Sequence, residues 1–130
     1  MSIPGLEANA NISANQFEAV KMTGTTSKFR VSAIAANTDR PIGILQNNPN
    51  AAGQAAEVEK PGEVCKARYG GNVNAGDLLG PDADGELVAL TVITDGSAVD
   101  RYACAQALED GADQEVHYVL AISPWLAAKA

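Results

Sequence analysis

The stretch KPGEVCKARY, residues 60–69, contains the two signals on which the fold prediction rests. Its Pro61-Gly62 pair suits the centre of a type II turn, because proline presets a negative φ and glycine accepts a positive one. After the turn, apolar or small residues alternate with charged ones over residues 63–69. This alternation is typical of a strand with one buried face. We therefore predict a strand here, paired through the turn with residues 55–59 as a hairpin.

The same combination of short runs and turn signals continues along the chain. Signals rich in Pro, Gly, Asn and Asp recur at short intervals, which is typical of an all-β sandwich or barrel. The segment 102–109 suits either a helix or a strand. Further strands are predicted at residues 17–23, 29–35, 87–93 and 115–122.

The fold class that follows is all-β: a single compact β-barrel or sandwich-like domain with short strands, dense turns and an extended N-terminal arm. Residues 1–15 are rich in Asn, Ala and Ser and contain Ile3 and Leu6 as isolated apolar residues, so we expect a loose arm or leader. The β-rich domain is then expected to span residues 16–130.

Composition narrows the classes of partner. The chain of 130 residues has a formal net charge of −7, and phosphate binding needs clustered Lys and Arg, so nucleic acid is excluded as a partner. The charge is uneven, because residues 1–68 have seven basic and six acidic side chains and residues 69–130 have two and ten. We expect no signal peptide and no membrane partner, because no apolar run is long enough to span a bilayer.

The sequence contains no recognisable catalytic constellation. His117 is the only histidine and alternates away from Val116 and Tyr118, so we expect a surface or interface residue. No Gly-x-Ser-x-Gly motif accompanies it. Cys65 and Cys104 are too few for a zinc site and are expected to be small core residues, with a disulfide between them as the alternative. We predict no enzyme activity, no metal ion and no cofactor.

Two motifs suggest a ligand but are better explained otherwise. Residues 82–86, DADGE, resemble part of a calcium loop, but Gly80 and Thr91 stand where the full pattern needs acidic residues. A hairpin turn is therefore favoured there. Lys21, in the sequence AVKM, resembles the lysine of biotin-carrying barrels, but too few residues precede it for the tip of a central hairpin.

Five segments follow one another in a characteristic order over residues 16–122. They are QFEAVKMTG (16–24), RPIGILQN (40–47), GQAAEV (53–58), GGNVNAGDLL (70–79) and DADGEL (82–87). In this order and spacing, the chain resembles the capsid cement, or head decoration, proteins of tailed bacteriophages.

The resemblance implies a non-enzymatic structural virion protein that binds the outside of a mature phage capsid and stabilises the shell. Proteins of this family are β-rich, commonly homotrimeric, and clamp neighbouring capsid subunits. The implied partners are therefore the major capsid protein and further copies of the chain itself. The implied location is the outer capsid surface of the virion, after synthesis in the bacterial host cytoplasm.

Four apolar residues are candidates for contacts with the capsid or within the trimer. Ile3, Leu6 and Phe17 lie in or beside the expected arm, which would become ordered on binding. Trp125, the only tryptophan, is either an interface anchor or a lid on the core. A different class of function is also open, namely a small β-barrel binding module for a glycan or a host surface, which would need an aromatic-lined site.

Overall fold

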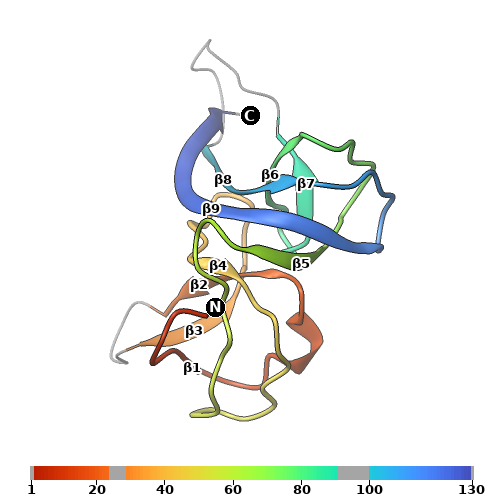
Figure 1. The fold of residues 1–130 in the computed structure, drawn as a ribbon. Coiled ribbons are helices and arrows are strands. Elements are labelled where there is room, and N and C mark those ends of the chain that lie inside the picture. Colours follow the sequence, from red (N-terminus) through yellow and green to blue (C-terminus); the bar gives the residue numbers. More distant parts are fainter. Residues whose placement is uncertain (1, 24–28, 91–99, 130) are drawn as a thin grey trace.

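The computed structural model describes residues 2–23, 29–90 and 100–129. Within these residues the chain forms two β-sheets and one short 3₁₀ helix at Ser13–Asn15, which confirms the all-β class (Figure 1). Neither sheet closes on itself in its strand order, so the architecture is sandwich-like and not a closed barrel. The described residues contain no helix that is long and apolar enough to cross a membrane.

The five-stranded sheet is built from the C-terminal half of the chain, in the order β5-β9-β8-β6-β7, and all its pairings are antiparallel. Its strands confirm three predicted segments and show that residues 102–107 of the ambiguous segment 102–109 belong to a strand. Residues 91–93, which we expected to extend one strand, lie outside the described residues. The strands are β5 (Val64–Arg68), β6 (Leu78–Pro81), β7 (Leu87–Ala89), β8 (Asp100–Ala107) and β9 (Val116–Lys129).

The turn at residues 82–86 joins β6 to β7 as a hairpin, as the sequence predicts. Asp82 caps this turn, because its Oδ1 accepts hydrogen bonds from the backbone N–H groups of Asp84 and Glu86 at 2.9 and 3.0 Å. Gly85 supplies the positive φ of 90° that the turn requires. Asp82 therefore has a structural role in the turn.

The four-stranded sheet has the order β1-β3-β2-β4, with β1 parallel to β3 and the other pairings antiparallel. Two of its strands confirm the predictions for residues 17–23 and 29–35. The strands are β1 (Glu7–Ala8), β2 (Ala19–Met22), β3 (Arg30–Ala33) and β4 (Gly43–Ile44).

Residues 2–15, which we expected to be loose, are part of the four-stranded layer. Leu6, Ala8 and Ile12 are buried, and the backbone N–H of Ile3 donates to the carbonyl of Val58 at 2.8 Å. The isolated apolar residues of this segment thus pack into a core formed with strands that are distant in the sequence. Such packing has no local periodicity, so it could not be predicted from the segment itself. The domain boundary at residue 15 stays a prediction.

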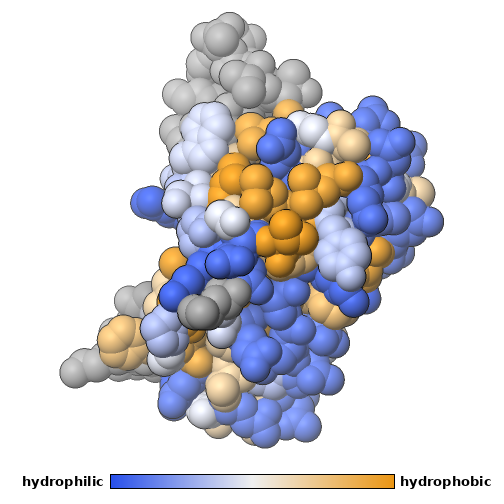
Figure 2. All heavy atoms as spheres, viewed as in Figure 1, coloured by the Kyte–Doolittle hydropathy of each residue, from blue (hydrophilic) through white to orange (hydrophobic). Residues whose placement is uncertain are grey.

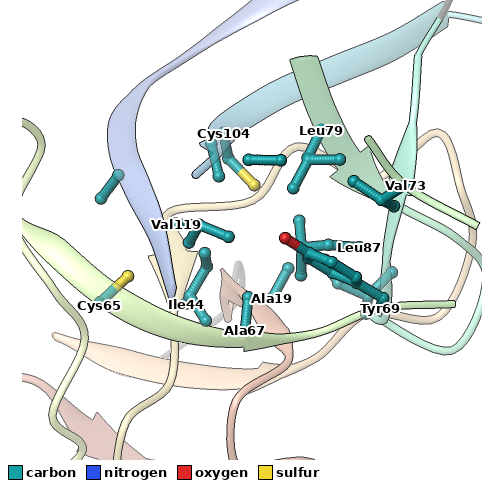
Figure 3. Packing of buried hydrophobic residues seen from close by; sticks show 14 residues of the cluster. Ala19, Ile44, Cys65, Ala67, Tyr69, Val73, Leu79, Leu87, Cys104 and Val119 are labelled. Carbon is teal, nitrogen blue, oxygen red and sulfur yellow. The ribbon is translucent and has the colours of Figure 1, made fainter. Parts of the chain in front are cut away.

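Two hydrophobic clusters stabilise the fold. The larger one lies inside the curved five-stranded sheet and extends to β2 and β4 (Figure 3). The smaller one fills the four-stranded layer. β2 and the segment of β4 contribute to both clusters, because Ala19 and Ile44 belong to the larger, and Val20 and Leu45, the residue directly after β4, belong to the smaller. Successive residues of a strand point to opposite faces, so these two strands connect the two layers.

The predicted hairpin between residues 55–59 and 64–68 is wrong, although its turn is present. Gly62 has a φ of 91°, and the N–H of Glu63 donates to the carbonyl of Lys60 at 3.3 Å, as a type II turn requires. Beyond the turn, β5 pairs with β9, while residues 55–59 form isolated bridges to residues 2, 7 and 45. The turn therefore joins the two sheets.

Candidate interaction surface

The structure does not bring the four predicted contact residues together. Ile3 packs against the smaller cluster and Leu6 lies within it, 6% exposed. Phe17 lines a hollow at one end of the five-stranded sheet. Trp125 is 47% exposed on β9 and pairs with Ala103, which is buried. The register between β8 and β9 shifts next to this pair, between Ala103 and Ala105. Their roles as contacts stay predictions.

A different set of side chains forms a continuous surface on the outer side of the five-stranded sheet. In one cross-strand row Val64 faces Leu120, which faces Gln106, which faces Leu78. In the next row Lys66 faces Tyr118, whose carbonyl accepts from the N–H of Leu108 at 3.3 Å. We call these seven residues the outer sheet face.

The outer sheet face exposes unusually large apolar side chains. Val64 is 56% exposed, Tyr118 49% and Leu108 45%. Scattered apolar residues on a surface need no explanation, but several in register on adjacent strands form a patch that is typical of interaction sites. Figure 2 shows hydrophobic side chains gathered over β9, with hydrophilic residues around them.

The inner side of the same strands holds smaller residues. Ala67 on β5 and Val119 and Ala121 on β9 are buried in the larger cluster, together with Cys65. His117 is also on this side, since its ring stacks on buried Tyr69 with centroids 5.1 Å apart. The strand thus turns its larger apolar residues outward and His117 toward the core side. The expectation that His117 is a surface or interface residue is met in part, because 24% of its side chain stays exposed.

A hollow of about 400 Å³ lies at the end of the outer sheet face. Phe17 and Tyr118 contribute aromatic rings to it, and Lys66, His117 and Glu109 contribute polar groups. Phe17 has a φ of 69°, which is uncommon for a residue other than glycine and costs free energy. Its backbone is held in place, because its N–H donates to the carbonyl of Leu45 at 2.7 Å and its carbonyl accepts from Arg68 at 2.8 Å.

Lys66 is the only charged residue of the outer sheet face. Its ammonium lies 5.7 Å from the centroid of the Tyr118 ring, a cation–π contact. Its backbone is also satisfied, because the Gln46 side chain donates to its carbonyl at 2.9 Å and accepts from its N–H at 3.1 Å. Gln46 therefore occupies the backbone groups at the outer edge of β5 at this point. The outer sheet face is left with side chains, and not backbone groups, for contacts with a partner.

His117 is paired with two carboxylates beside the hollow. Nδ1 lies 2.8 Å from Oε2 of Glu109, and Nε2 lies 3.1 Å from Oε1 of Glu115. The hydrogen bonds to Glu115 and Glu109 raise the pKa of His117 above 6.5, against the opposing effect of desolvation. The pKa values of both carboxyl groups are lowered, that of Glu109 mainly by the N–H of Tyr118 and that of Glu115 mainly by the N–H of Ala112.

This cluster predicts a pH dependence with a defined sign. The raised pKa of His117 means that its contribution to stability is full below pH 6.5 and is lost as the pH rises through the folded-state pKa. The lowered pKa values of Glu109 and Glu115 mean that their contribution is full above pH 4.5 and is lost in acid. We therefore expect the cluster to stabilise the fold most between these two values.

The single histidine makes the test direct. An NMR titration of the His117 ring is expected to show a midpoint above 6.5, which moves down toward 6.5 when Glu109→Gln and Glu115→Gln are combined. The free energy of unfolding is expected to fall less between pH 6 and pH 8 in His117→Gln than in the wild type. A wild-type midpoint at or below 6.5 would contradict the pairing.

The remaining candidates for chemistry have structural explanations. Lys21 lies within β2, not at a hairpin tip, and its ammonium pairs with Asp39 at 3.0 Å. Cys65 and Cys104 are buried free thiols, and burial raises the pKa of each to about 12. They are thus protonated at neutral pH and pack as small apolar residues, as the sequence suggested.

The carboxylates of the turn 82–86 gather on one side of the hairpin. One oxygen each from Asp82, Asp84 and Glu86 lies within 4.8 Å of the others. Burial, followed by the charges of Asp82, Asp113 and Asp84, raises the pKa of Glu86, while a hydrogen bond from Gln114 opposes this. One Asp82 oxygen already accepts hydrogen bonds from two backbone N–H groups, so the turn explains its position without a metal ion.

Comparison with known proteins finds similarity in fold. No protein-family model and no curated protein matches the chain. A solved structure with a similar fold is the N base of the head fiber protein gp8.5 of bacteriophage phi29, with a TM-score of 0.64 and 17% sequence identity. The match covers 96% of this chain and 93% of that one, so the similarity extends to both layers described above.

Proposed function

We propose that this chain is a non-enzymatic structural protein of a phage virion, which binds the outside of the mature capsid and stabilises the shell. The observation that supports this most is the fold shared with the N base of a phage head fiber over 96% of the chain. The sequence resemblance to head decoration proteins, reached from different features, points to the same class. The local sequence pattern and the fold of the whole chain together support the proposed function more strongly than either does alone.

The partners in this proposal are the major capsid protein and two further copies of the chain. A symmetric trimer on a three-fold site of the shell would repeat each contact three times, so modest contacts would add up to firm attachment. Binding that favours the folded form on both sides stabilises both partners by mass action. A partly exposed apolar surface such as the outer sheet face is what such a protein requires.

The location can be tested on intact particles. Mass spectrometry of purified virions is expected to detect the chain, and antibodies against it are expected to label the heads of unopened virions. Heads that lack the chain are expected to release their DNA at a lower temperature. Absence from purified virions, or labelling only after the heads are opened, would contradict an outer structural role.

The hollow favours one alternative worth testing. Its aromatic residues Phe17 and Tyr118, with His117 and Lys66 beside them, form the kind of surface on which a sugar ring stacks. In this alternative the chain is a binding module for a glycan or host surface. A rise in melting temperature on adding a glycan, which is lost in Tyr118→Ala, would support this alternative. No shift with any glycan of a panel would contradict it and favour the capsid-binding function.

A further inference from the structure

The outer sheet face differs in charge from the rest of the molecule. The chain has 16 acidic and 9 basic residues, yet none of the seven residues that define this face is acidic and one, Lys66, is basic. Interfaces are depleted of charge at their centres, and a mixed apolar and aromatic surface is typical of them. The face is thus the part of the sheet where a second protein can approach without meeting the general negative charge.

The contact that this face offers is made by side chains. At the outer edge of β5, the backbone N–H and carbonyl of Lys66 are hydrogen-bonded to the Gln46 side chain. The next N–H on that edge, of Arg68, donates to the carbonyl of Phe17. An added strand would have to displace these bonds. A partner that lies flat on the sheet keeps them and covers Val64, Tyr118 and Leu120 together.

The charge on Lys66 identifies the kind of partner. No carboxylate among the described residues forms an ion pair with its ammonium, and Glu109, which lines the same hollow, is engaged by His117 and the N–H of Tyr118. Two copies of the chain that met through this face would bury two ammonium groups against rows that contain no carboxylate. Burying an unpaired charge is costly, so a two-fold contact of this kind is disfavoured.

We propose that the outer sheet face docks on the phage shell, against an apolar surface of the capsid subunit that presents a carboxylate to Lys66. This inference rests on the proposed function and adds to it the face and the chemistry of the partner. The hollow beside Tyr118 would receive one large side chain of that subunit, since a few anchor side chains that fill pockets supply much of the binding energy of an interface. Phe17, one of the contact residues predicted from sequence, then acts as a wall of that pocket.

The test compares variants for binding to mature heads of the phage that encodes the chain, after removal of their accessory proteins. Val64→Glu places a carboxylate in an apolar row of the face, and Lys66→Glu reverses its only charge. Each is expected to weaken binding at least tenfold, and Lys66→Met, which keeps the apolar stem, less than Lys66→Glu. Phe29→Glu is the matched control, since it makes the same charge change as Val64→Glu at an exposed apolar residue beside β3, and is expected to bind like the wild type.

Each outcome decides a different point. If the wild type binds and both face variants bind equally well, the assignment of the face is overturned while the proposed function stands. If the variants change the mass of the free protein in sedimentation velocity, the face belongs to a contact between copies, and the docking proposal fails. If the wild type itself does not bind, the proposed function and the docking proposal fail together. Circular dichroism melts verify folding, and Tyr118→Ser replaces Val64→Glu if that variant does not fold.

Discussion

Replacement of Tyr69 by alanine is expected to lower the free energy of unfolding by about 3–5 kcal/mol. Tyr69 is the largest of the fully buried side chains among the described residues, and its ring extends into the larger cluster (Figure 3). Its removal would leave a cavity and would also remove the stacking partner of His117. Because small domains have a total stability of about 5–15 kcal/mol, the loss would be a large part of the whole.

The matched variant is Tyr69→Phe, which keeps the ring and removes the hydroxyl. That hydroxyl donates to the carbonyl of Glu109 at 2.9 Å, so the expected loss is about 1 kcal/mol. Urea unfolding followed by circular dichroism measures both variants. Equal losses in the two would mean that the hydrogen bond, and not the packing of the ring, accounts for the contribution of this residue.

Leu6→Ala is expected to cost about 2–4 kcal/mol, although the residue lies only six positions from the start of the sequence. The reason is its burial among Val20, Val31 and Val58 in the smaller cluster. Ile3→Ala is the comparison, because Ile3 is only partly buried against the same cluster and should cost clearly less. Both are measured by urea unfolding of the whole chain.

This pair separates two descriptions of residues 1–15. In a loose arm that becomes ordered only on a partner, neither substitution would change the stability of the free protein. A loss for Leu6→Ala shows that the segment is part of the folded layer. Deletion of residues 1–15 would then be a poor test of shell binding, because it would also remove β1 and much of the smaller cluster.

The features predicted well from the sequence are those that depend on neighbouring residues. The turn at Pro61-Gly62, the strand that follows it and the hairpin turn at residues 82–86 all have local signals, and all are present. The pairing partners were not predictable in the same way. Residues 55–59 bridge to three separate parts of the chain, and nothing in their own pattern favours those partners over the adjacent strand.

None of the seven residues of the outer sheet face was among the contact residues predicted from the sequence, although their pattern contains a signal. Residues 116–122 are apolar on both sides of the alternation, with Tyr118 and Leu120 on one side and Val119 and Ala121 on the other. A strand that is apolar on both faces is typically covered on both. The core covers one face of β9, and the outer sheet face is the other, so this double pattern was the signal for an exposed apolar surface.

The measurement that tests the central claim most directly is co-sedimentation of the purified chain with mature heads stripped of accessory proteins. An outer structural protein of the virion is expected to bind saturably, at a fixed ratio to the capsid subunits, and not to bind unexpanded proheads. Failure to bind mature heads at concentrations well above those of the capsid sites would contradict the proposed function and leave the shared fold without a capsid role.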